Sequence, residues 1–297
     1  MSLVNAYYPD TTYLLTRRIK DRYFYLTPKH DDIAPMIGYA MAYAAKKHNI
    51  TVFAYSGMSN HTHLTVHDNE GNLPLFMRDM NRMIAVYINK KFGFTENVWS
   101  SQKPGFTILP ETQDVMNKIL YTLLNPVQAG LVDNHVNWPG LMMKPRHILK
   151  KSVVFKRPKQ HFSKNTKFPK EVELEIGVPE GFKDITKESY VQYLQEKLKE
   201  NEKDIKLARG NKKFLGRRGV KKFHHKYQPE TNPGKRKLNP RVAGKNREIL
   251  IMWKIAIRNF RLAYREAWEE YKAGNRNVLF PYGTYKMRIE HNVNVAV

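Results

Sequence analysis

The sequence predicts an α+β fold with helices packed on a sheet, followed by a basic, mainly helical C-terminal extension. In the first 140 residues, short runs of β-branched and aromatic residues alternate with longer segments whose apolar residues recur every three or four positions. Beyond residue 185 only the helical period continues, and basic residues accumulate. With 297 residues, 41% of them hydrophobic, the chain can bury a core in one large domain or two ordinary ones.

The elements of the first part follow from local patterns. We expect strands at 13–19, 23–27, 50–57, 60–67 and 106–109, and helices at 31–49, 72–93 and 111–125. The first helix begins with acidic and ends with basic residues, which suits the helix dipole. Gly93 ends the second helix. Pro126 is expected to end the third at or near Asn125, because the residue before proline disfavours α geometry.

The remaining chain divides at changes of composition. Prolines interleave with lysines from 138 to 184, which predicts a linker or wrapping arm without regular structure. Residues 186–209 predict a charged helix. Residues 245–273 predict the clearest helix of the protein, with an aromatic stripe from Trp253 to Tyr271 interpreted as core between helices. The expected boundaries are therefore 1–140, a basic arm at 141–185, and a basic helical accessory region at 186–297.

Charge and composition restrict the kinds of function that the protein can have. The net charge is +24, and residues 1–140 account for only +2 of it, so the polyanion-binding surface is expected in the other half. The chain has no cysteine, which excludes disulfides and thiolate-bound zinc and fits a reducing cytoplasm, the expected location. No secretory signal and no apolar stretch of membrane-spanning length is visible.

His61 and His63 are the most informative residues of the first part. They stand two positions apart in an expected strand, where alternate side chains leave on the same face about 6–7 Å apart. Two neutral imidazoles so placed can bind one divalent cation. Tyr121 and Asn125 lie at i and i+4 on the polar face of the third helix, so a phenol and an amide oxygen are neighbours there. Such a set could polarise a phosphate and attack it.

These residues resemble a known family. His61-Thr62-His63 resembles the HUH motif, and the segment from Tyr121 through Asn125-Pro-Val to Val132 resembles the nucleophile segment of single-tyrosine transposases. The resemblance covers roughly residues 10–140 and is closest to the REP-associated tyrosine transposases within the IS200-like superfamily. Thr62 stands where the family usually has a hydrophobic residue, and Gln128 replaces a common arginine.

The resemblance implies a fold, a reaction and a site. The fold would be the ferredoxin-like antiparallel sheet with helices of the HUH core. Tyr121 would be the nucleophile, and His61, His63 and Asn125 would hold Mg²⁺ or Mn²⁺, since an amide oxygen and open positions suit harder ions than zinc. The reaction would be cleavage and transfer of a DNA single strand through a 5′-phosphotyrosine intermediate. No nucleotide cofactor is expected, because the chain lacks a phosphate-binding Gly-x-x-x-x-Gly-Lys loop.

The basic half is expected to hold single-stranded or hairpin DNA. The DNA-binding prediction rests on clustered cations interleaved with Phe214, Phe223 and Tyr227, which suit phosphate contact with occasional stacking on an unpaired base. A solvated, disordered loop is the alternative. The predicted residues are Lys212, Lys213, Arg217, Arg218, Lys221, Lys222, Lys235, Arg236 and Lys237. The oligomeric state, monomer or homodimer, stays open.

Two other functions remain open at this point. A metal-independent two-histidine phosphoesterase would use His63-Leu-Thr65 with His161-Phe-Ser163. A domesticated nucleic-acid-binding protein would keep the fold with an idle site. Tyr87 is interpreted as core rather than as a rival nucleophile, and His67 as too far along its strand to share a metal with His63.

Overall fold

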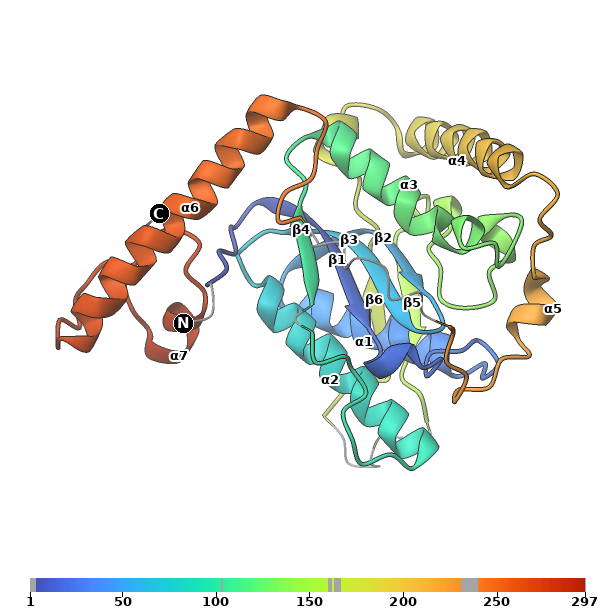
Figure 1. The fold of residues 1–297 in the computed structure, drawn as a ribbon, viewed down its shortest axis with the longest axis horizontal. Coiled ribbons are helices and arrows are strands. Elements are labelled where there is room, and N and C mark those ends of the chain that lie inside the picture. The colour runs from blue at the N-terminus through green and yellow to red at the C-terminus, as the bar shows by residue number, and fades with distance from the viewer. Residues whose placement is uncertain (1–3, 103, 160–161, 163–166, 231–239, 297) are drawn as a thin grey trace.

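The computed structural model describes residues 4–102, 104–159, 162, 167–230 and 240–296. Its centre is a four-stranded antiparallel sheet with helices on both faces, from which a long C-terminal helix extends outward (Figure 1). The predicted α+β class, with a mainly helical C-terminal extension, is confirmed.

The sheet has the ferredoxin-like order. Its strands are β1 (Thr11–Arg18), β2 (Ile50–Gly57), β3 (His61–Asp68) and β4 (Gly105–Ile108), arranged β2-β3-β1-β4 with antiparallel neighbours. A helix follows β1 and another follows β3, which gives two interleaved split βαβ units. The central strands β1 and β3 pair over their full length, with Thr16 opposite His63 and Arg18 opposite His61.

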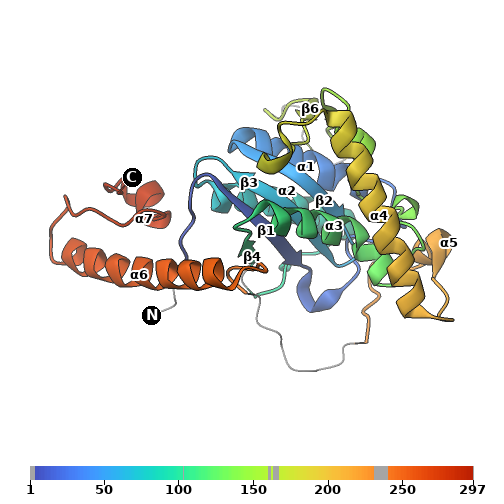
Figure 2. The same ribbon diagram turned by 90° about the horizontal axis from the view of Figure 1, so that it is seen from above.

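Three helices cover this sheet. Helices α1 (Ile33–Lys47) and α2 (Leu73–Phe92) pack against each other on one face, and α3 (Thr112–Gln128) lies on the other (Figures 1 and 2). The alternation along β3 explains the division: Leu64 and Val66 are buried on the face of α1 and α2, whereas Thr65 hydrogen-bonds Thr122 of α3 at 3.2 Å.

Two local predictions in this part are wrong. Helix α3 continues through Pro126 instead of ending at Asn125, because the burial of Pro126 and Val127 stabilises the helix against the loss of one backbone hydrogen bond. Ala129 N still donates to Asn125 O at 3.0 Å. Residues 23–27 form a loop rather than a strand, held by the bond from Leu26 N to Ser59 O at 2.9 Å.

The segment 138–184 is more ordered than its composition predicts. It contains a two-stranded antiparallel sheet of β5 (Val153–Lys156) and β6 (Glu171–Leu174), which packs on α1. Its apolar residues Trp138, Met143 and Ile148 are buried in the main core. Because these residues are scattered rather than periodic, the sequence pattern missed their packing. Short 3₁₀ turns occur at Lys20–Arg22, His135–Asn137, Pro145–His147 and Glu180–Phe182.

The C-terminal part contains α4 (Lys187–Arg209), α5 (Gly216–Val220), α6 (Arg247–Lys272) and α7 (Lys286–His291). Helix α4 is the charged helix expected at 186–209, and it packs on α3 with its buried apolar residues. Helix α6 extends away from the sheet in both ribbon views (Figures 1 and 2).

The interpretation of the α6 stripe as core between helices is wrong. Only Phe260 and Ala267 of this helix are buried, and their partners are the two ends of the chain. Tyr8 packs edge-on against Trp253 and Phe260, and Phe280 packs against Tyr264. Periodicity identified the apolar face but could not show that the two terminal segments of the chain, including α7, would cover it. Among the described residues, no helix is long and apolar enough to cross a membrane.

Candidate active site

Strand β3 brings His61 and His63 together on the face of the sheet that α3 covers. Their ring centroids are 4.7 Å apart and their planes are perpendicular. His63 is buried and His61 half-buried. The two imidazoles thus converge on one small region, as their spacing predicts.

Two neighbours orient these rings. Thr16 Oγ1 lies 3.0 Å from His63 Nδ1, and Asn60 Oδ1 lies 2.6 Å from His61 Nδ1. The amide oxygen of Asn60 can only accept, so His61 Nδ1 carries the proton, and the Thr16 hydroxyl can accept from His63 Nδ1 in the same way. Both Nε2 atoms then carry the ring lone pair, which is the arrangement that a metal-binding histidine requires.

Electrostatics keeps both rings neutral. Burial, together with the positive charge of Arg18, lowers the pKa of His61 to about 4. Burial, the neighbouring His61 and Arg18 hold the pKa of His63 well below its usual value. Uncharged imidazole is the form that binds a metal, so the environment favours a cation over a proton at this position.

Helix α3 adds the tyrosine and the amide. The ring of Tyr121 meets that of His63 edge-on, with centroids 5.3 Å apart, and the side chain of Asn125 hydrogen-bonds His61. The Thr65 hydroxyl anchors α3 over β3 through Thr122. The four predicted site residues are therefore neighbours.

The surroundings of this group are cationic. The Lys118 ammonium lies 5.6 Å from the centroid of the Tyr121 ring, and Arg18 and Arg22 are close enough to act on the charge of His61. Among the described residues, no three His, Cys, Asp or Glu side chains form a metal-binding group. A metal ion here would therefore need the Asn125 amide oxygen as a ligand beside the two histidines. Few anionic groups would compete with a phosphate for the lysine and arginine side chains around the site.

The alternative residues lie elsewhere. Tyr87 is buried in α2 and donates to Asp32, which confirms its interpretation as core. His67 bonds Thr12 at 3.0 Å and Asp10 at 3.0 Å, away from His63. His161 and Ser163, which the phosphoesterase alternative requires, lie outside the described residues.

Residues 209–228, here called the basic strap, connect α3 to the loop after β1. At one end Leu215 N and Gly216 N donate to the carbonyls of Gly130 and Leu131, at 3.1 and 2.9 Å. At the other end the loop and the strap exchange bonds: Phe24 N donates to the carbonyl of Tyr227 at 3.0 Å, and the Lys221 ammonium pairs with Asp31 at 2.7 Å. The strap has eight Lys and Arg residues and no Asp or Glu.

The predicted DNA-binding residues separate into three groups. Five are exposed on the strap: Lys212, Lys213, Arg217, Arg218 and Lys222. Lys221 is half-buried in its ion pair. Lys235, Arg236 and Lys237 lie outside the described residues. Of the aromatic residues expected to stack on bases, Phe223 is half-buried and Tyr227 is exposed, and both also pack on Phe24.

Sequence reasoning missed Thr16, Asn60, Arg18 and Arg22. Asn60 could have been found from its position beside His61. The other three lie on or just after β1, and only the register of β1 against β3 reveals them. That pairing joins residues more than forty positions apart, so no local sequence pattern predicts it.

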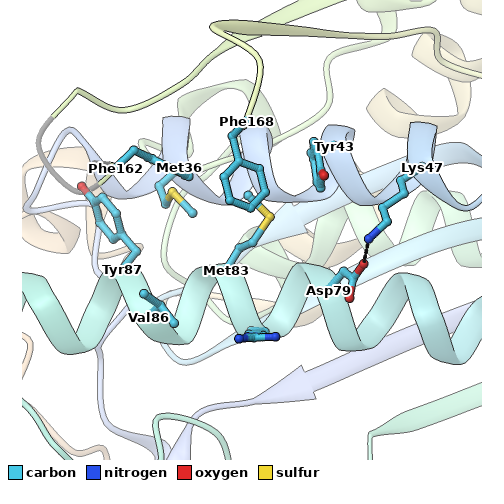
Figure 3. Close-up of a pocket in the computed structure, with 10 residues that line it drawn as sticks. Met36, Tyr43, Lys47, Asp79, Met83, Val86, Tyr87, Phe162 and Phe168 are labelled. Atoms are coloured by element: carbon cyan, nitrogen blue, oxygen red, sulfur yellow. Dashed lines mark hydrogen bonds and ion pairs between the residues drawn. The ribbon is translucent and has the colours of Figure 1, made fainter. Parts of the chain in front are cut away.

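A cavity of about 460 Å³ lies away from the histidine pair, between α1 and α2 (Figure 3). Its walls are mainly apolar and aromatic, and Phe162 and Phe168 lie over it. The ion pair of Lys47 with Asp79, at 2.7 Å, closes one end. Because these helices cover the opposite face of the sheet from α3, this cavity is separate from the candidate active site.

One protein family matches the core of the chain. Residues 8–107 match the family described as "Transposase IS200 like". The predicted relationship to IS200-like transposases is thereby confirmed over this segment. The matched segment includes His61 and His63 and ends before α3, so it does not extend to Tyr121 and Asn125.

Two solved structures are similar to the chain. A REP-associated tyrosine transposase bound to a REP hairpin shares 18% identity, with a TM-score of 0.41, over 57% of this chain and 96% of that one. A "putative transposase" from Deinococcus radiodurans shares 17% identity, with a TM-score of 0.29, over 42% of this chain and 97% of that one. No curated protein matches the chain.

Proposed function

We propose that this protein is a single-tyrosine transposase that cleaves a DNA single strand and transfers it through a 5′-phosphotyrosine intermediate. The observation that carries the proposal is the convergence of the two β3 histidines with Tyr121 and Asn125 of α3. The similarity of residues 8–107 to IS200-like transposases supports a transposase role.

In the proposed reaction, the Tyr121 oxygen attacks a backbone phosphorus. A bond forms between that oxygen and phosphorus, the bond from phosphorus to the 3′ oxygen breaks, and this oxygen leaves as a 3′-hydroxyl after taking up a proton. The tyrosine remains joined to the 5′ phosphate of the other fragment. A second 3′-hydroxyl can reverse the step, so strand joining needs no ATP.

His61, His63 and Asn125 would hold a divalent cation, Mg²⁺ or Mn²⁺. The residues fit such an ion, because both histidines are neutral with their Nδ1 atoms engaged and the third ligand is an oxygen. When bound, the ion neutralises charge on the phosphate. Lys118 and Arg18 would attract and orient the same phosphate.

The basic strap supports DNA as the partner. It connects Gly130 and Leu131, just after the end of α3, with the loop that follows β1. Its exposed cations Lys212, Lys213, Arg217 and Arg218 would contact phosphates of the bound strand. If a hairpin or other folded DNA end bound beside the site, the unpaired strand next to it would be presented to Tyr121.

The test is a Tyr121→Phe substitution, which removes only the attacking oxygen. The probes are single-stranded oligonucleotides that tile the DNA flanking the reading frame, with a pool of randomised sequence. A 3′ label should show a covalent protein–DNA adduct, and a 5′ label should show the released 3′-hydroxyl fragment. Both products should disappear in the variant, while the Kd for DNA stays within about twofold, because the phenol contributes little to binding.

Tyr193→Phe is the matched control, since this half-buried tyrosine of α4 packs on Phe182 and should keep full activity. An adduct that persists in Tyr121→Phe would exclude Tyr121 as the nucleophile. Cleavage in EDTA without an adduct would favour the phosphoesterase alternative. Binding without any cleavage by the wild-type protein would favour a domesticated DNA-binding protein.

A further inference from the structure

The loop after β1 begins a continuous run of aromatic rings at the edge of the candidate active site. Tyr23 and Tyr25 are stacked, with centroids 5.3 Å apart and planes 7° apart. Tyr25 meets Phe94 at 4.9 Å, and Phe94 meets Phe92 at 5.7 Å. Phe92 stacks on His225 at 3.9 Å, and His225 lies 4.0 Å from His224. We call these six rings the aromatic ladder.

One end of the ladder adjoins the catalytic residues through the backbone. Asn60, which orients His61, donates from its side chain to the carbonyl of Arg22 at 3.3 Å, and Leu26 N donates to the carbonyl of Ser59 at 2.9 Å. The loop that carries Tyr23 and Tyr25 therefore lies along the two residues that precede His61.

The other end is built by the basic strap. Phe223 and Tyr227 pack on Phe24, and Thr27 Oγ1 donates to the carbonyl of Phe223 at 3.1 Å. These contacts fix the backbone around His224 and His225, so His225 can stack on Phe92 of α2. Rings from three segments distant in sequence thus form one surface.

The residues of the ladder are more exposed to solvent than aromatic residues of the core. Tyr23, Tyr25, Phe92, Phe94 and His225 are all half-buried, and His224 is exposed. Aromatic residues that served only packing would be expected to be covered, as Tyr13, Tyr39 and Tyr55 are in this chain. The ladder keeps ring surface in contact with solvent along its length.

Charge around the ladder favours an anionic ligand. Exposed cations flank it at Arg22, Lys29, Lys222 and Lys226. Of the neighbouring carboxylates, Asp31, Asp32 and Glu96 are each paired with a lysine, and Asp21 lies near Tyr25. Half-exposed rings beside unneutralised cations are the arrangement that binds single-stranded nucleic acid, because bases stack on the rings and phosphates meet the cations.

We infer that the aromatic ladder is a binding track for the unpaired DNA strand next to the cleavage position. This inference rests on the proposed function for its ligand and deepens it, because it assigns the path of the strand beyond the catalytic residues. Successive bases would stack from Tyr23 and Tyr25, nearest His61, toward Phe94 and His225. Stacking is tolerant of sequence, so the track would select unpaired over paired DNA rather than one sequence over another.

Binding is measured with Tyr121→Phe protein in EDTA, so that no cleavage is needed. The probes are a labelled oligo(dT) strand and a blunt duplex of the same length. Tyr25→Ala should weaken binding of the single strand about tenfold, since each stacked base contributes a comparable factor. Binding of the duplex should stay within about twofold. Tyr25→Phe should bind like the parent because it keeps the ring.

Tyr282→Ala is the matched control, because this tyrosine is 41% exposed and lies near the C-terminus. Crosslinking tests the same track without any substitution: 5-iodouracil in the oligonucleotide should attach to Tyr23, Tyr25, Phe94 or His225 of otherwise native protein. Unchanged single-strand affinity in Tyr25→Ala, or crosslinks only to aromatic residues outside the ladder, would overturn the inference.

These outcomes separate the track from the catalytic proposal. If the wild-type protein forms the tyrosine adduct but the ladder variants bind normally, only the track is rejected. If the ladder variants lose single-strand affinity while no protein forms an adduct, the catalytic proposal is rejected and the binding track stands.

Discussion

At the residue scale, a threonine hydroxyl and an amide oxygen determine how the histidine pair presents itself. Thr16 and Asn60 occupy the Nδ1 atoms, so both rings offer Nε2 to the region beside Tyr121 and Asn125. An imidazole ring that could rotate or change tautomer would for part of the time not present the lone pair of Nε2 to this region. Thr16 and Asn60 are therefore as characteristic of this site as the two histidines.

Thr16→Val tests this orientation, since it removes one hydroxyl at nearly constant volume. We expect the affinity for Mn²⁺ to fall by about one order of magnitude, because groups that hydrogen-bond the second nitrogen of a metal-binding histidine commonly contribute that much. The measurement is Mn²⁺ binding followed by electron paramagnetic resonance, which does not depend on DNA cleavage.

Thr12→Val provides the control on the same strand. Thr12 makes the same cross-strand contact, at 3.0 Å to His67 Nδ1, but His67 lies outside the candidate site. Equal Mn²⁺ affinity in the two variants would show that the Thr16 hydroxyl does not orient a ligand.

At the element scale, the end of α3 is the point where the helix that carries Tyr121 and Asn125 meets the basic strap. Gly130 has a φ of +70°, and a Cβ atom there would lie 2.3 Å from the Arg209 guanidinium. Arg209 in turn donates to the carbonyls of Lys212 and Lys213 and lies 4.9 Å from the centroid of Phe214. Together with the backbone hydrogen bonds to Gly130 and Leu131, this arginine holds the strap against the helix that carries Tyr121.

Gly130→Ala should therefore destabilise the protein by about 1–2 kcal/mol and loosen the strap, because the new methyl group adds a clash to the strain of a positive φ. Gly93→Ala isolates the strain, since Gly93 has a φ of +71° and nothing within 4 Å of its Cβ position. Urea unfolding compares the two, and limited proteolysis reports on the strap. Equal destabilisation, with no faster cleavage of residues 209–228, would contradict this role of Arg209.

The elements also show where sequence reasoning succeeds. His61 with His63, and Tyr121 with Asn125, were predictable because each pair lies within one element, whose period fixes the geometry. Thr16 and Arg18 were not, because the pairing of β1 with β3 is a non-local property. The loop of Tyr23 and Tyr25 has the composition of a strand, but Leu26 bonds Ser59 instead of a partner strand, so propensity gave the wrong structure.

At the scale of the whole molecule, most of the positive charge lies outside the segment that contains the candidate site residues. Residues 1–140 carry a net charge of +2, and the remaining residues carry the other +22 of the total of +24. The strap is one of the described segments that connect the two, because it belongs to the basic half in sequence but lies against α3 and the loop after β1 in space. Its cations should therefore contribute strength to DNA binding, whereas the catalytic residues should contribute the reaction.

The salt dependence of DNA binding tests this division. Each phosphate contact to a single strand contributes about 0.7 to the slope of log Kd against log salt concentration. Replacing Lys212, Lys213, Arg217 and Arg218 by Gln should reduce that slope by about 3 and weaken binding at low salt. The comparison is a variant in which Lys150, Lys151, Lys170 and Lys183 are replaced by Gln; these exposed lysines carry the same total charge on the segment between α3 and α4. A slope that falls equally in both variants would mean that the strap has no specific place in the DNA interface and that net charge alone attracts the strand.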